Sequence, residues 1–181
     1  MNLSIYILLG LFNSIFGFTP VNNKITKITK NNIEDFQRGQ KGFLFIDERV
    51  GTGKSPSYGD ILEVHYKGWY ATHNDTKVVQ FDDSRWNDDK QGLKFEYGTA
   101  PIIQGWNLAL KNMKEGGFRT IILPPNLGYG NYEVHSEGRP SIPPNSELRF
   151  DIELINVDDD FFRKIKTNLY NFLRPNGRDY L

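Results

Sequence analysis

Near the C-terminal end of the chain, apolar and charged residues alternate without interruption from position 148 to position 154. The apolar members are Leu148, Phe150, Ile152 and Leu154, and the charged ones are Arg149, Asp151 and Glu153. Successive side chains of a β-strand point to opposite faces of a sheet, so this pattern predicts a strand with one buried face and one solvated face. Such strands are typical of antiparallel sheets.

Other segments carry strand patterns as well. Between positions 61 and 70, Leu62, Val64 and Tyr66 occupy one face of a predicted strand, while Glu63, His65 and Lys67 occupy the other. Shorter strands are predicted around 43–46, 80–84, 93–97 and 119–123, separated by turn-forming residues. The chain is therefore predicted to build one antiparallel sheet.

One central segment, 101–113, has helical spacing. Trp106, Ala109, Leu110 and Met113 fall on one face, and Gly116-Gly117 provides a stop. We therefore predict an α+β fold in which the sheet wraps around one short α-helix. A C-terminal amphipathic helix is predicted over 158–181, after three aspartates suited to a helix start. It is expected to pack on its own domain, with contact to a membrane surface as the alternative.

Charge and composition limit the classes of function. The 22 basic and 22 acidic residues cancel, so no overall field favours binding to nucleic acid. The chain has no cysteine and only three histidines, and we predict neither a metal site nor a cofactor. The GTGKS segment at 51–55 is not a nucleotide-binding loop, because that loop requires glycine where Glu48 stands.

The N-terminal 39 residues are predicted to be a targeting leader. The apolar run 5–12 is too short to span a bilayer and precedes Gly17, so 1–17 is predicted to be a signal peptide, with a hydrophobic first strand as the alternative. Segment 18–39 has the basic, hydroxylated composition of a transit peptide or a linker. Together they resemble the two-part plastid leaders of algae with secondary plastids. The alternative is an endoplasmic-reticulum or secreted protein with an Asn-rich linker.

Bulky apolar side chains recur in the predicted strands and turns without a catalytic nucleophile, general base or metal cluster beside them. They are Tyr66, Phe81, Phe95, Ile103, Trp106, Tyr129, Ile142 and Phe150. One acid, Asp82, directly follows Phe81. An apolar pocket with few polar groups suits a reaction that makes or breaks no covalent bond, such as rotation about a prolyl amide. Taken singly, Trp106, Phe95 and Phe150 are better explained as part of the core.

Six motifs then occur in the order, and near the spacing, of the FKBP-type peptidyl-prolyl isomerases. They are VGTGKSPSYGDILEVHYKGWY, VQFDDS, LKFEYG, IIQGWNLALKNMKEGG, ILPPNLGYG and IPPNSELRFDIELINV. The resemblance covers about residues 42–157, and we place the domain at 40–157. It implies a strongly curved antiparallel sheet cupped around the short helix, with the substrate proline in the cavity between them.

The resemblance also implies a set of site residues. The cavity would be lined by Tyr66, Phe95 and Phe150, with Trp106 as its floor, Phe81 as a wall, and Leu93, Ile102 and Ile142 at its sides. Its polar contacts would be the Asp82 carboxylate, the Ile103 backbone N–H and the Tyr129 hydroxyl. Catalysis is assigned to Asp82, Tyr129, Phe81 and Trp106. Lys67 and Leu93 depart from the family pattern, as do inserts at 72–79 and 133–139.

The implied function is a peptidyl-prolyl cis-trans isomerase that assists protein folding by binding a twisted amide without covalent chemistry. Its partners would be proline-containing polypeptides, and the resemblance extends to macrolide ligands such as tacrolimus or rapamycin. We expect a monomer located in the plastid. The alternative function is a catalytically weak proline-peptide binding module or chaperone whose rim inserts recruit a client.

Overall fold

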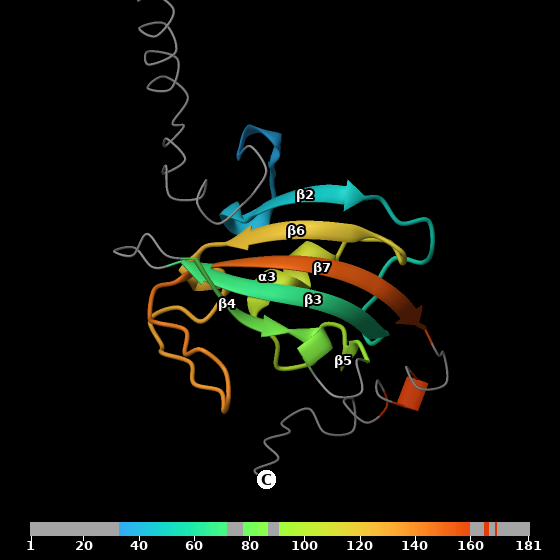
Figure 1. The fold of residues 1–181 in the computed structure, drawn as a ribbon. Helices are drawn as coiled ribbons and strands as arrows, with labels where there is room; N and C mark the ends of the chain where they lie inside the picture. Colours follow the sequence, from blue (N-terminus) through green and yellow to red (C-terminus); the bar gives the residue numbers. More distant parts are fainter. Residues whose placement is uncertain (1–32, 72–77, 87–90, 160–164, 167–168, 170–181) are drawn as a thin grey trace, which may run out of the picture.

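The computed structural model describes residues 33–71, 78–86, 91–159, 165–166 and 169. The predicted signal peptide and most of the transit-like segment lie outside these residues. The described strands are β1 (Gln37–Arg38), β2 (Leu44–Arg49), β3 (Ile61–Ala71), β4 (Val78–Asp83), β5 (Leu93–Glu96), β6 (Phe118–Leu123) and β7 (Glu147–Asp158). The helix α3 (Gln104–Leu110) lies behind the sheet in Figure 1. The 3-10 turns are η1 (Ile33–Asp35), η2 (Gln40–Gly42), η3 (Ser84–Trp86) and η4 (Pro125–Leu127).

The strands form one antiparallel sheet in the order β1-β2-β6-β7-β3-β4, and β5 also pairs with β3. Strand β7 pairs with β3 along its whole length, from Asp158 opposite Ile61 to Glu147 opposite Ala71. On its other edge, β3 pairs with β5 over residues 61–64 and with β4 over residues 67–71. The two short strands therefore leave an interval at residues 65–66. There the Ser84 hydroxyl of η3 accepts a hydrogen bond from the Tyr66 backbone N–H at 3.1 Å.

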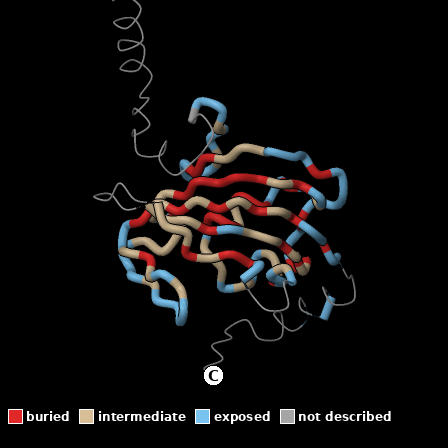
Figure 2. The backbone as a smooth tube through the Cα atoms, viewed as in Figure 1, coloured by how far each residue is buried: buried red, intermediate tan, exposed pale blue. Residues whose placement is uncertain are grey.

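The core lies between the concave face of the sheet and α3. The four apolar residues of the alternating segment in β7 are at most 3% exposed, and Trp106, Ala109 and Leu110 of α3 are equally buried. In Figure 2 the buried positions follow the central strands. Each large apolar side chain buried in this way contributes about 1.5–3 kcal/mol. The predicted α+β fold, with an antiparallel sheet around one short helix, is confirmed.

The helix is shorter than the predicted 101–113. Ile103 has an extended backbone conformation (φ −59°, ψ 143°) and forms the N-cap, so α3 begins only at Gln104. At the other end, Met113 donates its N–H to the Leu110 carbonyl at 3.0 Å in a turn. The turn leads to Gly116, whose φ of 82° no helix can accommodate. Met113 is nevertheless buried, as its helical spacing suggested.

The ends of the sheet also differ from the predicted boundaries. Strand β1 pairs with β2 through Gln37 and Arg38, so the sheet begins before residue 40. Asp158 is the last residue of β7 and pairs with Ile61, so the prediction that it helps to start a helix is wrong. Most of the predicted C-terminal helix lies outside the described residues. None of the helices that the described residues form is long and apolar enough to cross a membrane.

Candidate functional site

A cavity of about 180 Å³ opens between α3 and the concave face of the sheet. It is lined by Tyr66, Phe81, Asp82, Leu93, Pro101, Ile102, Ile103, Trp106, Tyr129 and Phe150. Asp82 is the one charged residue in this lining. The remaining lining is apolar or aromatic, and the two tyrosines add phenolic hydroxyls. The cavity can therefore enclose an apolar group while offering a few polar contacts at its edge.

Edge-to-face packing fixes the aromatic rings of this cavity. The Trp106 ring meets the Tyr66 ring at a centroid distance of 5.0 Å and an interplanar angle of 78°. It meets the Phe150 ring at 5.3 Å and 89°. Phe81 meets Phe150 at 5.7 Å and 89°. These geometries are favoured by the ring quadrupoles, so the cavity is a preformed shape.

Gly68 lets two of these rings approach the sheet. It lies on β3 opposite Phe150 of β7 and Asp82 of β4. A Cβ atom at this position would lie 2.8 Å from the Phe81 ring and 3.0 Å from the Phe150 ring. A side chain at this position would force the two rings to shift, so glycine allows them to lie close against the sheet.

The polar edge of the cavity centres on Asp82. Its carboxylate accepts hydrogen bonds from the Tyr66 hydroxyl at 2.6 Å and from the Asp83 backbone N–H at 2.8 Å. The same carboxylate forms an ion pair with Arg139. Burial raises the pKa of the Tyr66 phenol, and the positive charge of Arg139 opposes this shift. Tyr66 is therefore protonated at neutral pH and is able to donate to Asp82.

Two further polar groups belong to residues that line the cavity. Burial raises the pKa of the Tyr129 phenol, so this hydroxyl also keeps its proton at neutral pH. Ile103 is the N-cap of α3, and its backbone N–H precedes the helical hydrogen-bond ladder. A phenol and a backbone amide are thus available as donors beside an apolar surface.

Two of the predicted site residues do not line this cavity. Phe95 packs against Trp106 at a centroid distance of 6.0 Å and is 8% exposed, so it supports the floor from within the core. Ile142 lines a smaller adjoining hollow of about 50 Å³, which also contains Arg139. Sequence reasoning missed Pro101, Gly68 and Arg139. The insert around Arg139 was recognised, but nothing in the sequence indicated that its arginine reaches Asp82.

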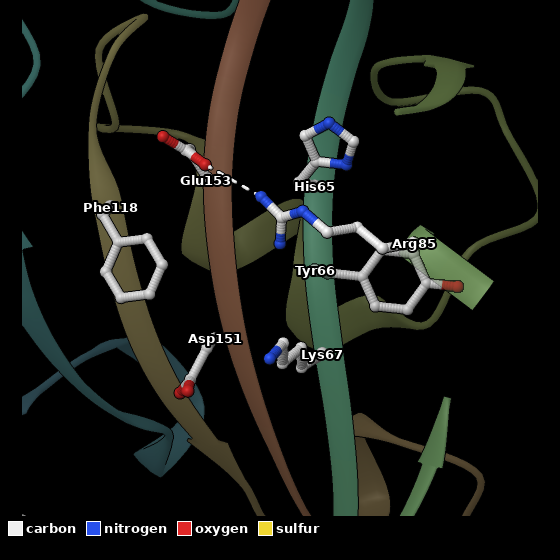
Figure 3. Close-up of a pocket in the computed structure, with 7 residues that line it drawn as sticks. All are labelled: His65, Tyr66, Lys67, Arg85, Phe118, Asp151 and Glu153. Atoms are coloured by element: carbon white, nitrogen blue, oxygen red, sulfur yellow. Dashed lines mark ion pairs between the residues drawn. The ribbon is translucent and has the colours of Figure 1, made fainter. Parts of the chain in front are cut away.

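A hollow of about 220 Å³ lies on the opposite face of the sheet. It is lined by His65, Tyr66, Lys67, Arg85, Phe118, Asp151 and Glu153 (Figure 3). Its carboxylates already have partners, since Arg85 and Arg49 contact Glu153 and Arg149 contacts Asp151. Four of its seven lining residues are charged, and it lacks the packed aromatic rings that surround the concave cavity. The concave cavity is therefore the candidate site, although the outer hollow is larger.

The described residues offer no cluster of side chains suited to binding a metal ion. Among the residues that the structure describes, no three or more histidine or carboxylate side chains are grouped to hold a metal ion. The arrangement is instead suited to holding an apolar ring and hydrogen bonding the groups beside it.

Known proteins share this arrangement. The chain is 35% identical over 124 residues to the FKBP-type peptidyl-prolyl cis-trans isomerase FkpA of Buchnera aphidicola subsp. Baizongia pistaciae, covering 68% of this chain and 44% of that protein. It is 38% identical over 116 residues to an FK506-binding protein of Neisseria meningitidis serogroup B, covering 64% of this chain and 96% of that protein. The chain thus spans less than half the length of the FkpA relative.

A solved structure and a family model agree with these relatives. The crystal structure of AtFKBP13 matches with a TM-score of 0.54 and 34% identity, covering 67% of this chain and 97% of that one. Residues 52–155 match the family model described as FKBP-type peptidyl-prolyl cis-trans isomerase. This match covers more than half of the chain and contains every strand and helix that builds the cavity, apart from the end of β7. The chain belongs to the FKBP-type peptidyl-prolyl cis-trans isomerase family.

Proposed function

We propose that this protein is a peptidyl-prolyl cis-trans isomerase that assists the folding of proline-containing polypeptides. The observation that carries the proposal is the preformed aromatic cavity with Trp106 at its base and Asp82 held at its edge. Family membership supports the same activity. The cavity volume of about 180 Å³ is enough for a proline ring and leaves the flanking peptide at the rim.

The physical basis is the loss of amide resonance during rotation. The barrier is about 18–20 kcal/mol because resonance stiffens the C–N bond. Water stabilises the planar, polar amide by hydrogen bonding its carbonyl, whereas the twisted amide is less polar and loses less in an apolar cavity. A rate increase of about a thousandfold requires about 4 kcal/mol of preferential stabilisation. A few non-covalent contacts are sufficient to supply it.

Each cavity residue has a role in this proposal. The proline ring stacks over Trp106 and against Phe81, within the enclosure formed by Tyr66 and Phe150. The Tyr129 hydroxyl and the Ile103 N–H donate to the carbonyls that flank the proline. The Asp82 carboxylate, fixed by Tyr66, polarises the edge of the cavity next to the rotating amide.

The test is a protease-coupled assay of cis-to-trans exchange in a proline peptide. Asp82→Leu and Phe81→Tyr should each lower kcat/KM by about tenfold while circular dichroism shows a folded domain. Phe118→Tyr, which makes the matching change in the outer hollow, should leave kcat/KM unchanged. Undiminished activity in the cavity variants would contradict the assigned roles. Peptide binding without acceleration in the unaltered protein would identify a binding module instead.

Ligand and location are further parts of the proposal. The aromatic cavity supports binding of macrolides such as tacrolimus or rapamycin, which titration of the intrinsic tryptophan fluorescence, including that of Trp106, would measure. The composition of residues 1–39 supports delivery to a plastid through a signal peptide. A fluorescent fusion of residues 1–40 expressed in a plastid-bearing alga should enter the plastid. Retention of the fusion in the endoplasmic reticulum would contradict this location.

A further inference from the structure

We propose that the small hollow beside the proline cavity is a side-chain subsite that prefers an uncharged hydrogen-bonding residue next to the substrate proline, and that Arg139 sets this preference. The inference rests on the proposed function, because it assigns a substrate class to the same site. It concerns the residues that flank the proline, whereas the isomerase proposal concerns the proline itself.

The subsite is continuous with the proline cavity. It holds about 50 Å³, enough for the end of one polar side chain. Its lining is Phe81, Asp82, Tyr129, Val134, Ser136, Arg139, Pro140 and Ile142. Phe81, Asp82 and Tyr129 line both spaces. Since successive Cα atoms are about 3.8 Å apart, a residue bonded to a proline in the cavity brings its side chain to this hollow.

The loop that carries Arg139 is built to present it there. Val134 and Ile142 pair as an antiparallel bridge, with hydrogen bonds of 3.0 and 2.9 Å that close the base of the loop. At its tip, the Arg139 N–H donates to the Ser136 carbonyl at 3.2 Å. Gly138, with a φ of 70°, occupies the third position of this turn, where a positive φ favours glycine. The turn thus fixes the backbone from which the Arg139 side chain extends.

Asp82 and Trp86 are both in contact with the side chain of Arg139. Its guanidinium forms the ion pair with Asp82, and both side chains are about three-quarters buried, at 27% and 23% exposed. The guanidinium carbon also lies 5.6 Å from the centre of the Trp86 ring. The hollow therefore presents a carboxylate and a guanidinium side by side, with the Ser136 hydroxyl in the same lining.

This pair of opposite charges discriminates against charged side chains. A substrate carboxylate would be attracted by Arg139 but repelled by Asp82, and a substrate ammonium would experience the reverse. Either would lose hydration without a net electrostatic gain. A carboxamide carries an N–H donor for the carboxylate and a carbonyl acceptor for the guanidinium, so both poles of the pair are satisfied. Glutamine and asparagine are therefore the side chains that the subsite fits.

The test uses proline peptides that carry Gln, Glu or Lys directly before the proline, and a second series with the same residues directly after it. Dissociation constants come from tryptophan fluorescence and kcat/KM from the exchange assay. In at least one series, the wild-type protein should prefer Gln about threefold or more over both charged residues. Equal binding of all three in both series would overturn the proposal.

Variants of Arg139 isolate its contribution. Arg139→Gln leaves Asp82 without its cationic partner, so the ratio of Lys to Glu binding should rise about fivefold in the selective series and should fall again with added salt. Arg139→Lys keeps the charge and should retain the wild-type order. Arg85→Gln, a control in the outer hollow, should change neither ratio. An unaltered Lys-to-Glu ratio in Arg139→Gln would refute the role of Arg139.

The two proposals fail in different ways. Selective binding without acceleration of exchange for any peptide would remove the isomerase activity and leave the subsite in place. Acceleration with no dependence on the flanking residue would keep the isomerase activity and eliminate the subsite.

Discussion

The Tyr66 hydroxyl donates a 2.6 Å hydrogen bond to the Asp82 carboxylate, which joins β3 to β4 at the mouth of the cavity. The bond couples two functions of the site. The Tyr66 ring packs edge-on against Trp106 at the base, while its hydroxyl orients the acid at the rim. The shape of the cavity and the direction of its charge thus depend on the same side chain.

Tyr66→Phe should therefore separate shape from polarity. The ring remains, but Asp82 loses one of its donors, so we expect kcat/KM to fall about threefold to tenfold and stability to fall by about 1 kcal/mol. The matched control is Tyr97→Phe, which removes a 2.8 Å hydrogen bond to the Asn107 carbonyl outside the cavity lining. The control should lose similar stability in urea unfolding and keep its activity. Equal activity losses in both variants would show that the Tyr66 hydroxyl has no special role.

Arg119 is expected to fix α3 to the sheet. Its side chain is 6% exposed, forms hydrogen bonds of 2.7 and 2.9 Å with Asp47, and donates to the Ala109 carbonyl of the helix. Arg119→Leu leaves Asp47 and that carbonyl without their donor, so stability should fall by about 3 kcal/mol. Lys54→Leu, at an ion pair with Asp159 in which the lysine is 58% exposed, should leave stability nearly unchanged. Chemical denaturation compares the two, and similar losses would contradict the prediction.

Three partly buried tyrosines predict how the free energy of unfolding responds to alkali. Burial raises the pKa values of Tyr66, Tyr97 and Tyr129, so the native state holds these protons more tightly than the unfolded chain does. Their contribution is fully present below the unfolded pKa of about 10 and is lost as pH rises through the raised folded values. In urea unfolding, the contribution of these tyrosines to the free energy of unfolding should be constant from pH 7 to 9 and should decline above about pH 10.

The slope of that decline identifies its source. Tyr97→Phe removes one of the three groups without touching the cavity lining, so its stability should decline less steeply than that of the wild type above about pH 10. A wild-type stability that rises over this range, or an identical slope in the variant, would contradict the assignment to these partly buried phenols.

The sheet could be predicted because its strands have one solvent-exposed face and one buried face. Buried positions around Phe150 and Trp106 are apolar and recur with the period of a strand or a helix. Both elements could therefore be identified from the spacing of apolar residues in the sequence. Their ends could not, because they depend on backbone hydrogen bonds. The backbone conformation of Ile103 and the pairing of Asp158 with Ile61 do not alter the spacing of apolar residues, so the sequence pattern could not reveal them.

The residues of the candidate site were likewise only partly predictable from the sequence. The rings that meet at Trp106 are large apolar residues in strands, and the family resemblance indicated which of them would converge. The roles of Arg139 and Gly68 depend instead on where the fold places them, which their residue types do not indicate. An arginine in a polar loop resembles any solvated residue until the fold brings that loop to Asp82. Phe95 shows the opposite case, since a core ring directly behind the floor has the same sequence signature as a lining ring.

Gly68 provides a test of whether the two phenylalanine rings shape the cavity. In Gly68→Ala the new methyl group would lie 2.8 Å from the Phe81 ring and 3.0 Å from the Phe150 ring, so both rings must shift toward the cavity. We expect a stability loss of about 1–3 kcal/mol from overpacking and a fall of about tenfold in peptide affinity, measured by tryptophan fluorescence at a temperature where the variant is folded.

The matched control is Gly42→Ala, since a Cβ at Gly42 meets no atom within 4 Å and affects only a turn with a φ of 86°. The control should lose stability through backbone strain and bind the peptide as the wild type does. If Gly68→Ala bound with wild-type affinity, Phe81 and Phe150 would have moved without changing the space that receives the proline, and their assignment as cavity walls would be wrong.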